Sequence, residues 1–552
     1  MKDNLKIYFS LLFLLPFLLF ACPPNPFRKA DLPKIIFPPG VEKPEKIKRM
    51  KFAVRKNIVI LCDFADNIHT YSPIDFNRLL FREGASSLRD YYREVSYGNL
   101  SLEGLVTEWQ RMDRTYSFYV ADSFGVFRDF PNNSQGLIYD LISKIDPDVN
   151  FRDFDNDGDG YVDCLIVVHA GPGAEETGNK RDFWSHKWQL SDNSTGCPGP
   201  YFTNDGVYID AYTLQPERFA DGDLMTIGVF AHELGHILGL PDLYDTDYSS
   251  NGLGIFCLMA AGSWAREDAS SLPGSSPVHL VSWCKYLLGW LNPDSLQKGY
   301  LEEKANATLS AVCDFPSAYR LLENPFGVDW SWENPGTGEY FLVENRYRRG
   351  FDKGLPGSGL LILHIDETRR GNDNERAPLV GILRPGKIGF SLPSYSWGEE
   401  SDLWKNDTTG FTEWTIPNSN FYSGLPSGVR VRNISSPGEV MSVDLAITPV
   451  FLGKVYAYPN PFLKGDNKEL KIYYCPSDTE RMRERPPFKV HIYTLAGEHI
   501  KTVDGVAERR VAYWDLKNSQ GKEVAGGLYL YVIEIATDGR KERQRGFFSV
   551  VK

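Results

Sequence analysis

The segment 226–245, TIGVFAHELGHILGLPDLYD, constrains the fold more than any other stretch of this 552-residue chain. Its apolar residues recur at helical spacing, and side chains four residues apart lie on the same face of a helix. His232 and His236 can therefore reach one common ion. Gly239 can take the left-handed conformation that ends a helix, and Pro241 prevents the helix from resuming. The segment predicts a helix that ends near Gly239 and a chain that then turns back.

The returning chain brings a carboxylate towards the two histidines. Asp242 follows His232 by ten residues, an offset that suits a helix, a glycine break and a return. Two imidazoles and a carboxylate leave a fourth position for water, which is the arrangement of a catalytic rather than a structural zinc site. We predict His232, His236 and Asp242 as zinc ligands, with Asp245 and Asp247 as the alternatives for the third.

Two further residues complete this prediction. Glu233 lies beside the ligands without being one, so we predict it to be the general base that acts on a zinc-bound water. Met259 lies in the downstream segment GIFCLMAAGSW, 254–264. A Met in a turn after an extended HExxH pattern is the hydrophobic floor under the zinc in metzincins, and we predict that place for Met259. A plain core methionine is the alternative.

A second acidic pattern, DNDGDGYVD at 155–163, is typical of a calcium loop of the EF-hand type. The predicted calcium ligands are the side chains of Asp155, Asp157, Asp159 and Asp163 and the carbonyl of Tyr161. The twelfth position is Ile166, so the usual bidentate Glu is missing and the affinity should be lower. Asp153 offers an alternative register, and a solvated acidic turn is the alternative to any site.

The start of the chain indicates export. Ile7 to Ala21 is an apolar run that is too short to span a bilayer and contains Pro16, so we interpret 1–22 as a signal peptide. Its end, LFAC, is similar to a lipoprotein signal, with lipidation of Cys22 and ordinary secretion as the two alternatives. Residues 23–50 are rich in Pro and Lys and are predicted to be a linker.

Charge and cysteine content exclude some classes of protein. There are 60 Lys and Arg against 72 Asp and Glu, a formal net charge of −12. A chain this acidic is a poor ligand for phosphate backbones, so we expect no nucleic-acid partner. The eight Cys have irregular spacings and no CxxC pair, which argues against a disulfide framework and favours buried small hydrophobes.

The predicted secondary structure divides the rest of the chain into three parts. Apolar strands such as 57–61 and 165–169 alternate with helical stretches such as 86–100, which predicts an α/β catalytic domain at 51–300. Strand-like segments between Gly/Pro turns follow, so 301–449 is predicted to be mainly β. Short strands with close turn signals predict a β-sandwich at 450–552. The fold class is therefore a multi-domain protein with an α/β peptidase-like part and two β parts.

These motifs together resemble the immune inhibitor A family of secreted bacterial zinc metallopeptidases. The matching stretches are SLRDYYREVSYGNLSLEG (87–104), DNDGDGYVDCLIVVHAGPG (155–173), FWSHKW (183–188), HELGHILGLPDLYD (232–245), LMAAGSW (258–264), PVHLVSWCKYLLGWL (277–291), EYFLVENR (339–346) and GLPGSGLLILHID (354–366). The resemblance implies a metzincin-like domain, zinc on His232, His236 and Asp242, Glu233 as general base, and bound calcium. The family carries a long inhibitory pro-segment, whereas only about thirty residues separate Cys22 from the domain here.

Residues 450–552 are similar to the Ig-like domain of flagellar hook-capping proteins and to C-terminal sorting domains of secreted bacterial proteins, through the YPNPF and VAGGLYLY pieces. The whole pattern predicts a secreted or cell-surface endopeptidase that acts on proteins or peptides and uses zinc and calcium, with Cys22 as the site of any lipid anchor. The alternatives are a non-catalytic surface adhesin that keeps a metal-stabilised domain, and a zinc hydrolase that acts on a non-peptide bond.

Overall fold

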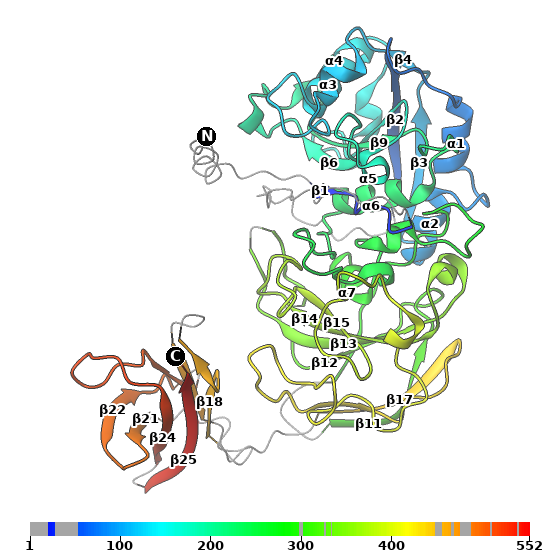
Figure 1. Cartoon of the computed structure of the whole chain (residues 1–552). Helices are drawn as coiled ribbons and strands as arrows, with labels where there is room; N and C mark the ends of the chain where they lie inside the picture. The colour runs from blue at the N-terminus through cyan, green and yellow to red at the C-terminus, as the bar shows by residue number, and fades with distance from the viewer. Residues whose placement is uncertain are drawn as a thin grey trace, which may run out of the picture.

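The computed structural model describes residues 20–27, 53–296, 302–324, 327–332, 334–447, 455–464, 469–474, 487–507, 510–537 and 540–551 (Figure 1). The predicted signal peptide, 1–22, lies almost entirely outside these residues, as does most of the predicted linker. Within the described part, no helix combines the length and apolarity that a bilayer crossing needs. The chain is a multi-domain, mostly β protein.

A mixed seven-stranded sheet organises the N-terminal part, in the order β1-β6-β9-β5-β2-β3, with β4 paired to β2. The strands β2, β3, β4, β5 and β9 run parallel to their partners, whereas β6 and β1 are added antiparallel at one edge. Their bounds are β1 (Phe20–Ala21), β2 (Ala53–Asp63), β3 (Leu100–Val106), β4 (Gln110–Arg111), β5 (Leu165–His169), β6 (His186–Gln189) and β9 (Ala211–Pro216).

Apolar residues on both faces of the central strands explain why this sheet is covered on both sides. On β2, Ile58 and Ile60 enter one hydrophobic cluster and Val59 and Leu61 enter another, because successive side chains point to opposite faces. The helices are α1 (Pro73–Phe81), α2 (Leu88–Val95), α3 (Tyr116–Val120), α4 (Ser134–Ile145), α5 (Ala174–Thr177), α6 (Ile227–Ile237) and α7 (Ser282–Leu287). Helices therefore pack on both faces of this sheet over much of 53–296, and the α/β class of this part stays a prediction.

Three local predictions are confirmed here. The helix predicted within 86–100 is α2, which begins after Ser87: the Ser87 hydroxyl accepts from the Asp90 backbone N–H, and Asp90 closes the capping box. The strand predicted at 165–169 is β5, and the strand at 57–61 lies inside β2. The remaining short elements of this part are η1 (Phe151–Phe154), η2 (Asn193–Thr195), β7 (Tyr201–Phe202), β8 (Tyr208–Ile209), η3 (Gly254–Phe256) and η4 (Ala261–Trp264).

Two antiparallel-rich sheets follow. One has the order β10-β12-β13-β14-β15 and the other β11-β17-β16. The bounds are β10 (Asp294–Leu296), β11 (Glu302–Ser310), β12 (Ala318–Leu321), β13 (Glu339–Arg346), η5 (Gly350–Gly354), β14 (Gly359–Asp366), β15 (Val380–Leu383), η6 (Glu400–Asp402), β16 (Val429–Arg432) and β17 (Val440–Ile447). One hydrophobic cluster runs from helix α6 into these sheets, so the core is continuous across residue 300. The domain limit at 300 stays a prediction.

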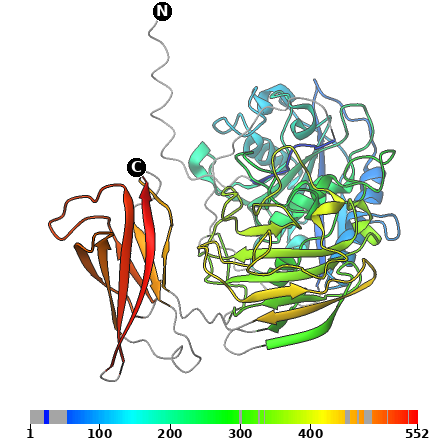
Figure 2. The ribbon, with the colours of Figure 1, turned by 60° about the horizontal axis from the view of Figure 1, so that its bottom comes forward.

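The C-terminal strands form two sheets around a hydrophobic cluster of their own (Figure 2). The sheets have the orders β18-β20-β23 and β19-β25-β24-β21-β22. The bounds are β18 (Val455–Tyr458), β19 (Phe462–Leu463), β20 (Leu470–Tyr474), β21 (Phe488–Thr494), β22 (His499–Asp504), β23 (Val511–Trp514), β24 (Gly527–Thr537) and β25 (Arg540–Val551). The Ig-like assignment of this part stays a prediction.

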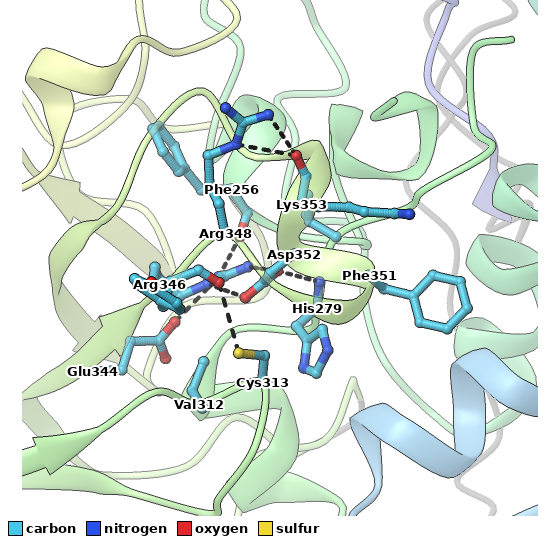
Figure 3. A network of polar contacts seen from close by, with 12 residues as sticks. Phe256, His279, Val312, Cys313, Glu344, Arg346, Arg348, Phe351, Asp352 and Lys353 are labelled. Atoms are coloured by element: carbon cyan, nitrogen blue, oxygen red, sulfur yellow. Dashed lines mark hydrogen bonds and ion pairs between the residues drawn. The ribbon is translucent and has the colours of Figure 1, made fainter. Parts of the chain in front are cut away.

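A buried ion network joins the N-terminal part to the sheet that follows it (Figure 3). Arg346, at the end of β13, is fully buried and pairs with Asp352 at 2.6 Å and Glu344 at 3.2 Å. Its guanidinium also donates to the carbonyl of Phe256, and the Asp352 carboxylate accepts from the backbone N–H of His279. Both of these partners belong to the N-terminal part, so one guanidinium holds the two parts in register.

Removal of the Arg346 guanidinium should lower the free energy of unfolding. Arg346→Met leaves two buried carboxylates unpaired, and we expect a loss of about 3–5 kcal/mol in the free energy of unfolding, measured by chemical denaturation with tryptophan fluorescence. The control is Arg93→Met, which breaks an ion pair with Glu83 in which both side chains are more than half exposed. It should cost less than about 1 kcal/mol. Equal stability of the two variants would contradict the role given to Arg346.

Candidate metal centre and its surroundings

Helix α6 carries the central motif of the sequence. It begins after Thr226 and ends at Ile237, and Gly239 follows in the left-handed region at φ 91°. The Leu240 N–H then donates to the Gly235 carbonyl, which turns the chain back over the end of the helix. The predicted helix, its glycine end and the return of the chain are all present.

The return brings Asp242 to the two histidines. The Nε2 atoms of His232 and His236 lie 3.1 Å apart. Asp242 Oδ1 lies 3.1 Å from His232 Nε2 and 3.3 Å from His236 Nε2. A point equidistant from these three atoms is about 1.8 Å from each, so an ion slightly out of their plane reaches the roughly 2.0–2.2 Å that zinc makes with nitrogen and oxygen ligands. The three predicted ligands are therefore brought together with a spacing that fits zinc.

The far side of each imidazole is held by the backbone. His232 Nδ1 lies 3.0 Å from the Leu258 carbonyl, and His236 Nδ1 lies 2.8 Å from the Leu240 carbonyl. A carbonyl oxygen can only accept, so each Nδ1 carries the proton and each Nε2 directs a lone pair towards Asp242. This is the outer hydrogen bonding that metal-binding histidines ordinarily have.

The charges of the group agree with this tautomer assignment. Burial lowers the pKa of His236, which favours the neutral imidazole. A carboxylate and neutral imidazoles facing one another are the donors that a divalent cation requires.

Glu233 lies one residue from the first ligand and is fully buried. Among the residues that the structure describes, neither of its carboxylate oxygens has a hydrogen-bond partner of normal geometry. Burial raises its pKa well above the usual range, and the neighbouring carboxylates of Asp242 and Glu175 raise it further. A buried carboxyl with both oxygens uncommitted is free to exchange a proton with a small molecule beside the ligands.

Met259 lies directly under the helix. A Cβ at Gly235 would lie 2.5 Å from the Met259 sulfur, so the thioether fills the space that this glycine leaves between His232 and His236. The Leu243 N–H donates to the Met259 carbonyl at 2.7 Å, which ties the returning chain to the same turn. The geometry is that of a floor under the ligand triad, although the role of Met259 stays a prediction.

The alternative third ligands lie elsewhere. Asp245 Oδ2 accepts from the hydroxyls of Ser249 and Ser250 and from the Ser250 backbone N–H. Asp247 accepts from the Ser249 N–H. Within the described residues, the ligand atoms that gather with His232 and His236 include Asp242 and neither of these two carboxylates.

Three other histidines end or lie within buried strands. His186 Nε2 lies 3.0 Å from the Ser134 hydroxyl, and its Nδ1 lies 2.6 Å from the Trp184 carbonyl. His169 Nδ1 lies 2.9 Å from the Ala170 carbonyl. His364 Nε2 lies 3.1 Å from a Glu339 carboxylate oxygen. Each is held by protein partners, as structural histidines are.

The predicted calcium loop is only partly assembled as a ligand set. Asp155, Asp157 and Asp159 offer oxygens within 4.8 Å of one another. Asp163 instead forms an ion pair with Arg55 at 3.0 Å and accepts from the Asn156 backbone N–H. The side chain of Tyr161 turns outwards and stacks on Tyr208.

Several residues around the centre were not found from the sequence. Glu175, on α5, is fully buried, and its pKa is raised to about 7 by burial; its carboxylate accepts from the Ser185 hydroxyl and backbone N–H. Tyr244 is buried, and Asp242 raises the pKa of its hydroxyl beyond the effect of burial. Glu175 lies just after the quoted stretch 155–173 and Tyr244 lies within 232–245, but nothing in their spacing distinguishes them from core residues.

Comparisons with known proteins bear on the same region. Residues 63–291 match the family described as immune inhibitor A peptidase M6, catalytic domain. Immune inhibitor A of Bacillus thuringiensis subsp. alesti is 32% identical over 367 residues, which cover 54% of this chain and 52% of that protein. The pre-pro-metalloprotease PrtV of Vibrio cholerae is 30% identical over 323 residues, which cover 50% of this chain and 33% of that protein.

A solved structure of PorZ, a surface component of the type-IX secretion system of Porphyromonas gingivalis, aligns at 15% identity over 39% of this chain and 37% of that one. Its TM-score is 0.15, which is too low to carry an argument about the fold. Among the curated relatives, this chain spans about half the length of immune inhibitor A and a third of PrtV. The shared region alone therefore does not assign the activity of these relatives to the whole of this protein.

The contact between Gly235 and Met259 can be tested. In Gly235→Ala the added methyl group meets the Met259 sulfur, and we expect overpacking to cost about 1–3 kcal/mol in the free energy of unfolding. Zinc affinity, measured by competition with a chromogenic chelator, should fall because the two histidines flank this position. Gly371→Ala is the control, since nothing lies within 4 Å of a Cβ there. Unchanged zinc affinity in Gly235→Ala would contradict the packing argument.

Proposed function

We propose that this chain, whose residues 63–291 match the immune inhibitor A peptidase family, is a zinc-dependent endopeptidase that hydrolyses peptide bonds of proteins. The observation that carries the proposal is the convergence of His232, His236 and Asp242 beside an uncommitted buried carboxyl, Glu233. The relatives are named as a metalloprotease and as immune inhibitor A, and the family is a peptidase family. A metal is therefore expected, and the donor set favours zinc.

The ligands and Glu233 would have different roles in the reaction. His232, His236 and Asp242 would hold the ion, which when bound supplies a Lewis acid for the scissile carbonyl and for the attacking water. Glu233 accepts the proton of that water and later delivers it to the leaving amine. The Leu258 and Leu240 carbonyls keep the imidazoles in the tautomer that the ligands need.

We also propose an extracellular or cell-surface location and a calcium-stabilised loop. The location rests on the apolar start of the sequence. The calcium proposal rests on the three clustered carboxylates Asp155, Asp157 and Asp159. With Asp163 engaged by Arg55, binding should be weak, and an extracellular calcium concentration near 1 mM would suit it.

The other candidate functions use the same residues differently. A non-catalytic adhesin needs no free carboxyl beside its metal ligands, whereas Glu233 keeps both oxygens uncommitted at the cost of burying them. A zinc hydrolase of a non-peptide bond would keep the same site, but the catalytic-domain match is to a peptidase family. The endopeptidase is therefore favoured.

Loss of the proposed base gives the most direct test. Glu233→Gln should retain stoichiometric zinc, because Glu233 is not a ligand, and should lower casein turnover by several orders of magnitude. Zinc is measured by mass spectrometry of the metal content, and turnover by release of labelled peptides with and without a chelator. Glu103→Gln, at an exposed position of β3, is the control and should match the parent. Full casein cleavage by Glu233→Gln would refute the mechanism.

The calcium loop is tested separately. Addition of millimolar calcium to the calcium-free protein should raise the melting temperature by a few degrees, because binding to the folded state alone stabilises it. Asp157→Asn should abolish this rise, whereas Asp153→Asn, outside the gathered carboxylates, should keep it. A rise that survives in Asp157→Asn would show that calcium binds elsewhere.

A further inference from the structure

Helix α2 packs against helix α6 and meets it with a tyrosine (Figure 1). The Tyr92 hydroxyl donates to the Ala231 carbonyl at 2.6 Å, and both residues are fully buried. Ala231 directly precedes the proposed ligand His232. A carbonyl inside a helix already accepts from the N–H four residues further on, so the hydroxyl is a second donor to this carbonyl. A side chain from a distant element is thus bonded to the main chain of α6 next to the first proposed ligand.

Two small residues let this side chain reach the helix. Ala231 and Gly235 are four residues apart and share one face, and the two histidine ligands, each one position further on, share the neighbouring face. A Cβ at Gly235 would lie 3.7 Å from the Tyr92 oxygen and 2.5 Å from the Met259 sulfur. The hydroxyl and the thioether therefore both lie against the main chain of α6, where a larger side chain would keep them away.

The helix that carries this tyrosine is held in place by other contacts. The Tyr91 hydroxyl donates to the Val278 carbonyl at 2.8 Å. Glu94 Oε1 lies 2.8 Å from His279 Nε2 and accepts from the Phe351 N–H at 2.8 Å. None of these partners belongs to α6. Helix α2 would therefore stay in place without its bond to α6, and the Tyr92 hydroxyl is a fixed point from which α6 is held.

The direction of the two imidazoles depends on the rotation of α6 about its own axis. The Leu258 and Leu240 carbonyls hold the outer ring nitrogens, and these bonds are made to the rings and not to the helix main chain. A rotation of about 10° would move an atom at the helix surface, about 5 Å from the axis, by roughly 1 Å. Zinc–ligand distances tolerate only about 0.2 Å. A directional hydrogen bond to the main chain limits such a rotation more strictly than the apolar contact with Met259 does.

We propose that Tyr92 is a positioning residue of the zinc centre: its hydroxyl holds the main chain of α6 at Ala231 and thereby sets the direction of His232 and His236. The proposal rests on the zinc centre of the proposed function. The bond is made to the main chain and not to the three ligand atoms. Its loss should therefore weaken the hold on the ion and leave the reaction of the zinc-saturated enzyme intact.

Two adjacent tyrosines give a matched pair of variants. Tyr92→Phe and Tyr91→Phe each remove one buried hydroxyl that is bonded to a main-chain carbonyl, but only the first carbonyl lies in α6. Both should lower the melting temperature by a similar amount, since each loses one buried hydrogen bond. Tyr92→Phe alone should lower the zinc affinity, measured by competition with a chromogenic chelator, by about tenfold. It alone should shift the visible absorption of Co²⁺ added to the metal-free protein. In saturating zinc, its kcat on casein should lie within about twofold of the parent.

A measurement without metal separates this proposal from the proposed function. Hydrogen exchange of peptides that cover 227–237 in the metal-free protein should be faster in Tyr92→Phe than in Tyr91→Phe. Equal zinc affinity of the two variants would overturn the proposal, whether both keep the affinity of the parent or both lose it. If the parent itself binds no zinc but the difference in exchange holds, Tyr92 still positions α6 and it is the zinc-dependent function that fails.

Discussion

Mutual repulsion among three electron-rich atoms is the constraint on which the centre depends. Two imidazole nitrogens and a carboxylate oxygen lie 3.1–3.3 Å apart, and their lone pairs face one another. Such a group is unfavourable in a buried site unless a cation lies within it, so the rest of the fold must hold it in place. The Leu258 and Leu240 carbonyls fix the imidazoles, and Met259 supports the helix at Gly235. The geometry of the proposed metal centre is therefore built by packing and by backbone hydrogen bonds outside the three ligand atoms.

The parts of this centre that could be predicted are the local ones. The spacing of His232 and His236 follows from helical periodicity, and Gly239 marks the end of α6 because its left-handed conformation is the one glycine adopts most readily. Contacts between distant segments leave no such pattern. The Tyr92 hydroxyl, for example, donates to the Ala231 carbonyl across 139 positions, and a helical pattern in 86–100 does not specify that partner. Periodicity gives the buried face of an element, but not the surface against which that face packs.

The predicted calcium loop and the predicted domain limits show the same difference between local patterns and distant contacts. A motif gives the order of its carboxylates, yet Arg55, which lies on a different strand, decides that Asp163 is engaged in an ion pair. Composition changes near residue 300, but the hydrophobic cluster does not end there, and Arg346 fixes the junction with a fully buried charge. A buried ion pair adds little net stability, but it fixes how the two parts are aligned. A misaligned pair would leave a buried charge without an oppositely charged partner. The sheet that follows the N-terminal part is thereby held at a defined place beside Phe256 and His279.

The edge of a sheet is a costly surface to leave open, because its unpaired main-chain groups attract other extended segments. In this molecule β1 pairs antiparallel with β6, and the Cys22 N–H continues the contact by donating to the Ser185 carbonyl. The indoles of Trp184 and Trp264 then donate to the Cys22 and Pro23 carbonyls. The edge strand next to helix α6 is therefore covered by a distant segment of the same chain through main-chain hydrogen bonds, a pairing that local sequence patterns do not reveal.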